Sequence, residues 1–236
     1  MRTALLRHGP DRRSARYHAA RISARAALRS QFGRRLHVDG LDEVPTDGNV
    51  LVVANHLSAL DPLLVGAYFP HTLFAMAKQD LFAGPLASWF LRGCNVFPVD
   101  RASADRRALQ TATEVLASGG RLMLFLEGTR PQTPGMLRAK PGAGFLLRRS
   151  GASVLPIAIW GTERALATGS RLPRRTEIHV RAGRLTQLDG NDHGGDGRNQ
   201  GLADRAAALI AALLPPEYRG VYAAIPRSSA RAPVPV

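Results

Sequence analysis

The fold is decided by one stretch of the sequence, Leu51-Val52-Val53-Ala54-Asn55-His56-Leu57-Ser58-Ala59-Leu60-Asp61-Pro62. An apolar, valine-rich run ends abruptly at Asn55-His56, and a second apolar run opens at Asp61-Pro62. This pattern predicts a buried strand, a tight loop and then a helix. It places the imidazole of His56 at the end of the strand.

His56 and Asp61 are five residues apart, so in a continuous helix they would be rotated by roughly 140° and could not meet. They come together only if the chain turns, and Asn55 and Ser58 suit such a turn. The carboxylate can then orient one ring nitrogen and leave the other free as a base. The pair lacks the nucleophile of a catalytic triad, which suits a base that activates a hydroxyl of the substrate.

A structural interpretation of the same residues is also open. Asp61 before Pro62 is a good helix N-cap, with proline at the first helical position. A lone histidine at a strand end is often only a satisfied polar group. The residues alone do not decide between the two interpretations.

Composition narrows the class of protein. The 236 residues, 45% hydrophobic and 21% charged, suit one sizeable α/β domain. The net charge of +14 implies an anionic partner: nucleic acid, lipid headgroups, an acidic carrier protein or a phosphorylated substrate. Lysine occurs only at Lys78 and Lys140, so a lysine is more informative here than an arginine.

Several classes of site and location are not expected. Cys94 is alone, which excludes an internal disulfide and fits a reducing compartment. The seven histidines never show paired zinc-ligand spacing, so we predict no metal and no cofactor. The longest uncharged stretch, 62–77, is too short to span a membrane, and no signal peptide is recognisable. A cytoplasmic or peripheral location is expected.

The segment 1–35 holds ten arginines and one acidic residue, Asp11. Its pattern predicts an amphipathic helix over about 12–32, with Arg21, Arg25 and Arg29 as a basic stripe. Such a helix suits docking on an anionic membrane surface. Packing on the domain with a solvated basic face is the alternative.

The remaining pattern alternates strands and helices, which predicts a single α/β domain over 36–214 with a mostly parallel central sheet flanked by helices. Strands are expected at 35–38, 50–54, 72–77, 93–101, 122–126, 154–159 and 177–181, and helices at 62–69, 85–91, 103–117, 140–149 and 202–214. Pro156 argues that its strand lies at an edge or carries a bulge. Residues 215–236 are expected to form a tail, disordered from about 226. Because open α/β sheets bind ligands at the carboxyl ends of their strands, Arg101, Glu127 and Arg130 could share one cleft with His56.

Four blocks in order resemble the glycerolipid acyltransferase family typified by 1-acyl-sn-glycerol-3-phosphate acyltransferases. They are Asn55-His56-x-Ser58-x-x-Asp61, Gly93 through Val99 to Arg101, Glu127-Gly128-Thr129-Arg130, and Leu155-Pro156-Ile157. The resemblance covers about residues 36–165. The chain departs from the family at Leu126, where proline is usual, and at Pro131, where serine is usual.

The resemblance implies a role for each matching residue. His56 would remove the proton from a substrate hydroxyl, and Asp61 would orient and support its imidazole. Arg101, Arg130 and Lys140 would hold the phosphate of the acceptor, and Glu127 would bind near the glycerol. The block that contains Gly128 and Thr129 would contribute further substrate contacts.

The resemblance implies acyl transfer from acyl-CoA or acyl-carrier protein, as co-substrate, to the hydroxyl of a lysophosphatidate-like phospholipid, giving phosphatidate. Glycerol-3-phosphate, another lysophospholipid or a glycolipid remain alternative acceptors. The expected place is the cytoplasmic side of the cell membrane, as a peripheral protein on anionic lipid. A basic nucleic-acid-binding module is the alternative from another class, but the charge lies mostly in residues 1–35 without interleaved aromatic residues, so no nucleic acid is expected.

Overall fold

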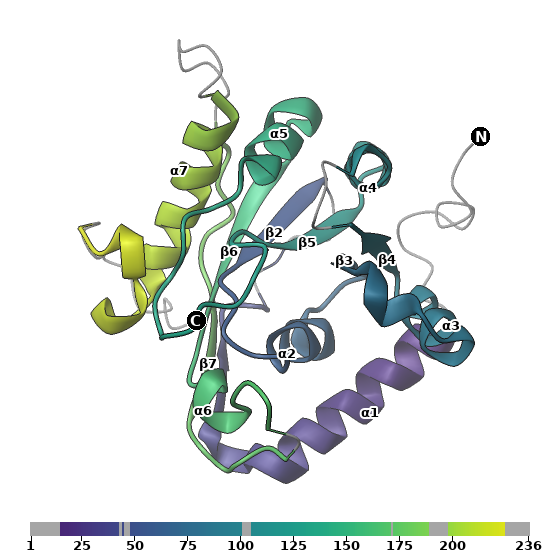
Figure 1. Ribbon diagram of the computed structural model, residues 1–236, viewed down its shortest axis with the longest axis vertical. Coiled ribbons are helices and arrows are strands. Elements are labelled where there is room, and N and C mark those ends of the chain that lie inside the picture. Colours follow the sequence, from purple (N-terminus) through teal and green to yellow (C-terminus); the bar gives the residue numbers. More distant parts are fainter. Residues whose placement is uncertain are drawn as a thin grey trace.

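The computed structural model describes residues 15–42, 44, 48–100, 105–170, 172–188 and 198–224. Within them, one seven-stranded sheet has the order β1-β7-β6-β2-β5-β3-β4. Its strands are β1 (Leu36–Asp39), β2 (Val50–Ala54), β3 (Phe74–Lys78), β4 (Val96–Val99), β5 (Arg121–Phe125), β6 (Ser153–Trp160) and β7 (Ile178–Ala182). All neighbouring strands are parallel except β6 and β7. The predicted single α/β domain with a mostly parallel sheet is confirmed (Figure 1).

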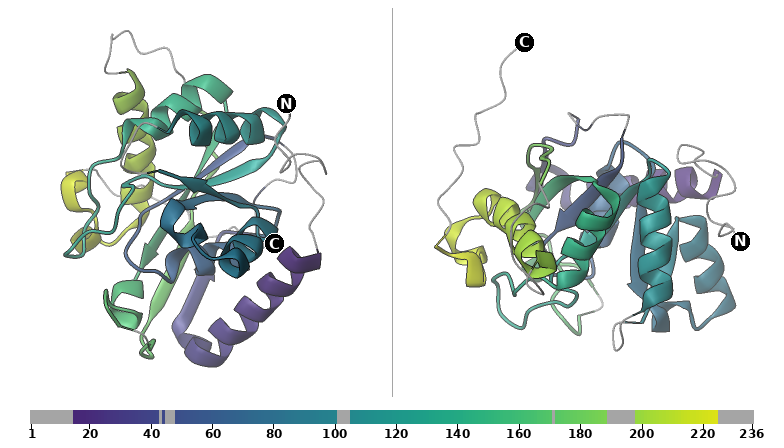
Figure 2. Two further views of the ribbon diagram at one scale, coloured as in Figure 1. Left: turned by 45° about the vertical axis from the view of Figure 1, so that its right-hand side comes forward. Right: turned by 90° about the horizontal axis from the view of Figure 1, so that it is seen from above.

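Helices cover both faces of the sheet (Figures 1 and 2). They are α1 (Ala15–Phe32), α2 (Asp61–Tyr68), α3 (Pro85–Gly93), α4 (Arg106–Ala117), α5 (Pro141–Ser150), α6 (Thr162–Ala165) and α7 (Arg198–Leu213). Short 3-10 turns are η2 (Gly33–Arg35), η3 (Gln79–Phe82), η4 (Pro216–Tyr218) and η5 (Gly220–Tyr222). Side chains of α4, α5 and α7 form one core with the sheet, and side chains of α1 and α2 form the other.

The strand β2 lies at the centre of both cores, and all five of its residues are buried. Leu51 and Val53 point into the core under α4, α5 and α7, whereas Val50, Val52 and Ala54 point into the core under α1 and α2. A strand covered on both faces needs a continuous apolar run, as the sequence has here. The end of β2 is therefore held firmly, and so is the loop that follows it.

The position of Pro156 differs from the prediction of an edge strand. Its strand β6 is an interior strand, paired with β2 on one side and β7 on the other. The regular pairing with β7 ends where Ile157 lies opposite Ala182, and the next bridge joins Val154 to Thr186. Between these two pairs, the segment that follows β7 has one residue more than β6. Pro156 therefore lies at an irregularity of the ladder, where its missing N–H removes no regular strand bond, while its carbonyl accepts the N–H of Gly183 at 2.8 Å. The expected bulge is present, and the edge position was wrong.

Two of the three arginines in the basic stripe of α1 contact the domain, and Arg29 is exposed. Arg21 donates to the carbonyls of Ala67 and Pro70, and Arg25 donates to those of Ala67 and Tyr68. These carbonyls lie at and just beyond the C-terminal end of α2, where the last turn lacks helical donors and carries partial negative charge. Tyr17, Leu28 and Phe32 on the same helix are buried. Of the two roles considered for this helix, the structure shows packing on the domain.

The first part of the expected C-terminal tail also packs on the domain. The Tyr222 hydroxyl donates to Asp204 of α7 at 2.7 Å and accepts the N–H of Ala139 at 3.0 Å. Tyr218 is buried and donates to Glu163 at 2.8 Å. Residues 225–236, where disorder was expected, lie outside the described part of the chain.

The helix α4 begins at Arg106, with the Asp105 carboxylate accepting the N–H of Ala108 at 2.9 Å as its N-cap.

In the described ranges, no helix has both the length and the apolar character needed to cross a membrane.

Candidate active site

His56 and Asp61 meet across the turn that follows β2. His56 Nδ1 lies 2.9 Å from Asp61 Oδ2, and both residues are buried. The chain leaves β2 after Ala54 and turns before α2 begins at Asp61. The turn thus brings together two side chains that a continuous helix would separate, as the spacing predicted.

Asp61 is held by more than the imidazole. Its Oδ2 also accepts the backbone N–H groups of Leu57 at 2.6 Å and of Ser58 at 2.7 Å. The residue at the N-cap of α2 is Leu60, and that cap has no side-chain hydrogen bond. The interpretation of Asp61 as a helix cap is therefore wrong: its carboxylate organises the preceding turn and orients His56.

The imidazole of His56 is fixed on a second side by an aromatic ring. The ring of Phe125, the last residue of β5, stacks on it with centroids 4.1 Å apart and an angle of 22° between the planes. A carboxylate only accepts hydrogen bonds, so Nδ1 carries the proton and the lone pair lies on Nε2. Nε2 has no hydrogen-bond partner in the described residues, and the side chain is 11% exposed. This nitrogen is the candidate base.

Asn55 ties the turn to the neighbouring strand. Its side-chain amide donates to the carbonyl of Ile159 at 2.7 Å and accepts the N–H of the same residue at 2.8 Å. The side chain thereby continues the ladder between β2 and β6 one residue beyond the strand. This role of Asn55 could not be predicted from the sequence, because its partner lies 104 positions away and is a backbone group.

Glu127 acts as a brace between two loops. Its Oε1 accepts the N–H of His56 at 3.0 Å, and its Oε2 accepts the N–H of Leu137 at 2.8 Å. The residue is 1% exposed, so both oxygens are engaged away from solvent. The expected proximity of Glu127 to His56 is present, because their strands β5 and β2 are adjacent and parallel. A direct contact with the glycerol of an acceptor stays a prediction, and the geometry makes Glu127 a positioning residue.

We expect Glu127→Gln to flatten the pH dependence of stability. Burial raises the pKa of Glu127 from 4.5 to about 7, although the amides of Leu137 and His56 act in the opposite direction. A carboxyl with a raised folded-state pKa contributes stability below its unfolded pKa and loses it as the pH rises through the folded value. For a shift of this size the contribution is about 3 kcal/mol, lost between about pH 4.5 and pH 7. Denaturant unfolding across this range measures it.

The exposed Glu217→Gln variant is the matched control and should keep the wild-type pH slope. Above pH 7 the Glu127→Gln variant should also be less stable by about 1 to 3 kcal/mol, because the amide nitrogen of glutamine leaves one backbone N–H without an acceptor. Equal pH slopes in the Glu127→Gln variant and the wild type would contradict this role of the carboxyl.

The other predicted substrate-binding residues lie near this brace. Thr129, Arg130 and Lys140 are exposed. Gly128 has φ of +68°, and a Cβ added there would lie 3.4 Å from Lys140 Cγ, so the lysine side chain runs across the glycine. Lys140 N–H also donates to the carbonyl of Leu126 at 2.8 Å, which ties the lysine to the end of β5. Arg101 lies outside the described residues, and its role stays a prediction.

Ser58 beside the site and Cys94, which precedes β4 and so lies at the opposite, amino end of the parallel strands, are both poorly suited to attack. Ser58 is 1% exposed and its hydroxyl donates to the carbonyl of Leu166 at 2.9 Å. Burial raises the pKa of the Cys94 thiol, against a smaller lowering by Arg16, so the reactive thiolate is disfavoured. The arrangement at His56 therefore provides a base and its orienting acid, and it suits a hydroxyl supplied by a substrate.

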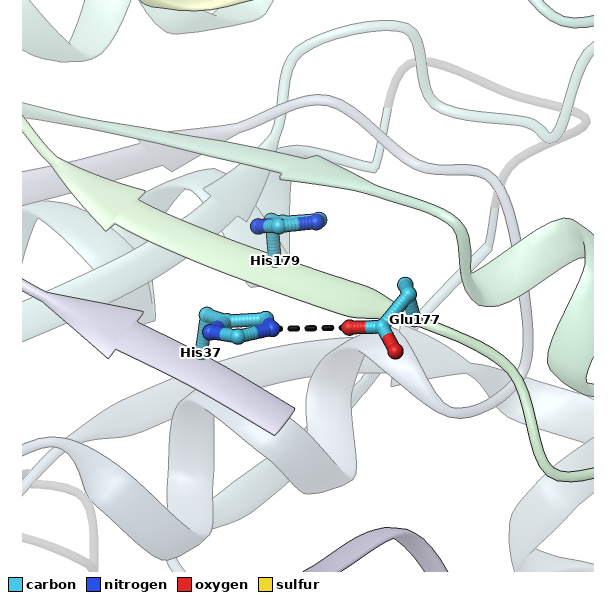
Figure 3. A group of neighbouring side chains, drawn as sticks. All are labelled: His37, Glu177 and His179. Atoms are coloured by element: carbon cyan, nitrogen blue, oxygen red, sulfur yellow. Dashed lines mark hydrogen bonds and ion pairs between the residues drawn. The ribbon is translucent and has the colours of Figure 1, made fainter. Parts of the chain in front are cut away.

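A second group of titratable residues lies on β1 and just before and on β7: His37, Glu177 and His179 (Figure 3). His37 Nε2 lies 2.8 Å from Glu177 Oε2, and the two imidazole rings stack with centroids 4.6 Å apart and an angle of 12°. The ring of Trp160 stacks on the other side of His179 at 4.6 Å. An imidazole binds a metal in its own plane, and two stacked parallel rings share no such plane. The group is an aromatic stack with a hydrogen-bonded carboxylate, and the absence of a metal cofactor stays a prediction.

Known proteins resemble this chain in sequence and in fold. A family model described as Acyltransferase matches residues 35–160. The 1-acyl-sn-glycerol-3-phosphate acyltransferase of Chlamydomonas reinhardtii is 32% identical over 179 residues, which cover 75% of this chain and 52% of that protein. The lyso-ornithine lipid O-acyltransferase of Pseudomonas aeruginosa is 32% identical over 111 residues, covering 47% of this chain and 42% of that protein.

The crystal structure of the 1-acyl-sn-glycerophosphate (LPA) acyltransferase PlsC from Thermotoga maritima superposes with a TM-score of 0.65 and 26% identity, covering 80% of this chain and 75% of that one. This chain spans about half, 45% to 52%, of the length of the first curated relatives it matches. The matched residues 35–160 contain the His56–Asp61 pair, the Glu127 brace and the sheet centre that holds them. On this evidence the chain belongs to the acyltransferase family.

Proposed function

We propose that the protein transfers an acyl group from an acyl thioester to the hydroxyl of lysophosphatidate, giving phosphatidate. The observation that carries the proposal is the His56–Asp61 pair, whose Nε2 has no partner and no suitable nucleophile beside it among the residues that the structure describes. The names of the related acyltransferases support lysophosphatidate as acceptor.

The proposed chemistry is one direct transfer. His56 Nε2 takes the proton of the acceptor hydroxyl while the hydroxyl oxygen attacks the carbonyl carbon of the thioester. The tetrahedral intermediate then expels the thiolate, which recovers the proton from the imidazolium. Asp61, at 2.9 Å from Nδ1, stabilises the imidazolium charge between these two steps. The products are the ester and the free thiol, and the histidine returns to its neutral form.

Arg130 and Lys140 are the residues we assign to the acceptor phosphate. Both are exposed cations next to the Glu127 brace, and Lys140 is one of only two lysines in the chain. A guanidinium recognises phosphate through paired hydrogen bonds, and an ammonium does so as a compact charge. The resemblance adds Arg101 to this group.

We expect Arg130→Ala or Lys140→Ala to raise the KM for lysophosphatidate by about ten- to a hundredfold, because a lost charge-assisted hydrogen bond costs about 1.5 to 3 kcal/mol. The KM for the acyl donor should change little. Steady-state kinetics with each substrate varied in turn would measure both constants. Arg149→Ala, which removes an exposed arginine of α5, is the control. A selective rise in the donor KM would instead assign these residues to the donor.

The acceptor and the donor define the alternatives. Another lysophospholipid or glycerol-3-phosphate fits the same chemistry, and the lyso-ornithine lipid acyltransferase is a relative with a different named acceptor. Either CoA or acyl-carrier protein would supply the thioester. A panel of these acceptors with one labelled acyl thioester, followed by identification of the lipid product, tests the proposal. Labelled phosphatidate should be the main product, and a different main product would reassign the acceptor.

We also propose that the protein works as a peripheral protein at an anionic membrane surface on the cytoplasmic side. A lysophospholipid is held in a bilayer or micelle by its acyl chain, so the enzyme has to reach that surface. The net charge of +14 favours an anionic leaflet.

A further inference from the structure

The helix α3 has its apolar stripe on the outside. Leu86, Trp89 and Phe90 follow the i, i+3, i+4 spacing of one helix face, and their exposed fractions are 75%, 54% and 50%. In a helix of a globular protein such a stripe normally faces the core. Here the helix turns it toward solvent.

The exposed apolar residues are concentrated at this place. Ten large apolar side chains are exposed in the described residues, and four of them fall within residues 81–90. The fourth is Leu81, 57% exposed, on η3, which directly precedes α3 and contacts it. We name Leu81, Leu86, Trp89 and Phe90 the α3 patch. Contiguous exposed apolar surface of this kind marks an interaction site.

Two arginines border the patch, one over the ring of Trp89 and the other over the ring of the adjacent Phe82, outside the patch. The guanidinium of Arg16, on α1, lies 4.5 Å from the centre of the Trp89 ring. The guanidinium of Arg92 lies 5.7 Å from the centre of the Phe82 ring. Both arginines are exposed. A tryptophan and aliphatic residues with cations at their rim are the composition of an interfacial membrane helix.

The patch begins at the same edge of the sheet as the active site. The segment η3–α3 leaves the carboxyl end of β3, and β3 is parallel to β5, which is parallel to β2. His56 and Glu127 follow the carboxyl ends of β2 and β5. Figure 1 shows α3 beside β3 and β4, at the end of α1 that carries Arg16. The helix starts at that edge and runs back to Gly93, before the amino end of β4, so Leu81 and Leu86 lie toward the edge of the sheet that carries the active site and Trp89 and Phe90 lie farther from it.

We propose that the α3 patch is the membrane-docking surface of the protein, with its apolar side chains inserted into an anionic lipid leaflet and Arg16 and Arg92 at the headgroups. The proposal rests on the proposed function, because it names the surface that brings the enzyme to its lipid substrate. Charge complementarity selects lipid as the occupant: the rim is basic, and the chain carries +14 overall.

This assignment replaces α1 as the main membrane contact. Two arginines of its basic stripe cap the end of α2, and Leu28 and Phe32 belong to the domain core. Deleting residues 12–32 would therefore expose that core and does not test docking separately from folding. Substitutions on the exposed face of α3 avoid this problem.

The chain offers a direct optical test, since its two tryptophans are Trp89 and Trp160. In a Trp160→Phe background, Trp89 is the sole indole. Adding vesicles of phosphatidylcholine with phosphatidylglycerol should shift its emission to the blue and protect it from acrylamide, and added salt should weaken the effect. Vesicles of phosphatidylcholine alone should act more weakly. An unchanged Trp89 spectrum while the protein sediments with the vesicles would overturn the proposal. Protection of the indole from acrylamide before any lipid is added would also overturn it, because another segment of the chain or a second copy would then cover the patch.

A second measurement uses the double variant Trp89→Ser/Phe90→Ser. Its affinity for the anionic vesicles should fall by at least about tenfold, which corresponds to about 1.4 kcal/mol. Leu172→Ser, which removes a leucine outside the patch that is even more exposed than Trp89 and Phe90, is the control and should bind as the wild type. Acylation of a short-chain, water-soluble lysophosphatidate should be unchanged in both variants. Vesicle binding by the double variant with the same affinity as the wild type would refute the docking surface. Absence of acyl transfer in the wild type would refute the proposed function, but it would not alter the conclusion about vesicle binding.

Discussion

Replacing His56 with Ala is expected to lower kcat for acyl transfer by about two to four orders of magnitude, the usual contribution of a general base. Nε2 of His56 is the candidate proton acceptor, and the hydroxyl of the neighbouring Ser58 is buried and already donates to the carbonyl of Leu166. The fold should survive, because the backbone N–H of residue 56 still donates to Glu127 and the side chain lies at the end of a strand. Thiol release from the acyl thioester measures the first effect, and thermal unfolding the second.

His18→Ala is the matched control for this variant, since His18 is exposed on α1. It should keep wild-type turnover. A folded His56→Ala variant with more than about a tenth of wild-type kcat would remove His56 from the role of base.

Asp61→Asn is expected to lower kcat by at least about tenfold, a loss of about 1.4 kcal/mol in transition-state stabilisation. Asparagine keeps the size and one acceptor oxygen for the amides of Leu57 and Ser58, but it removes the charge that stabilises the imidazolium. Stability should also fall, by about 1 to 3 kcal/mol, because the carboxylate is fully buried and the new NH₂ group meets no acceptor. Kinetics at a temperature well below the melting transition separates the two effects.

Asp42→Asn is the control for the charge itself, since that carboxylate is exposed. It should alter neither turnover nor melting temperature. Full activity in the Asp61→Asn variant would reject the dyad and leave Asp61 as an organiser of the turn alone.

The sequence predicted those features of the fold and the site that depend on residues close together in the chain. The valine-rich run before Asn55 predicted β2, and the five-residue spacing of His56 and Asp61 predicted their contact, because both depend on residues close together in the chain. The alternation of strands and helices likewise predicted the parallel sheet. These features need no knowledge of strand order.

Features that depend on distant backbone groups could not be predicted. Glu127 accepts two backbone amides, and Arg21 and Arg25 donate to backbone carbonyls, none of which has a signature in the sequence. Pro156 suggested an edge because the sequence does not reveal that a strand from residue 178 onward pairs beside it. The stacked pair His37 and His179 arises from a register between β1 and β7, whereas spacing rules detect only nearby ligands.

The α3 patch illustrates another limit. The spacing of Leu86, Trp89 and Phe90 predicts an apolar helix face, but it does not tell whether that face meets the core or solvent. That depends on how η3 and β4 orient the helix at the edge of the sheet. The exposed stripe is therefore visible only in the fold.

The most direct test of the account is whether thiol release requires the acceptor. In the proposed mechanism the acceptor hydroxyl attacks the thioester directly, with His56 as base, and no side chain of the protein is acylated on the way. Rapid mixing of the protein with acyl-CoA alone should therefore give no burst of thiol, and adding lysophosphatidate should release one thiol for each phosphatidate formed. A burst equal to the enzyme concentration in the absence of acceptor, with the acyl group found on the protein, would contradict it.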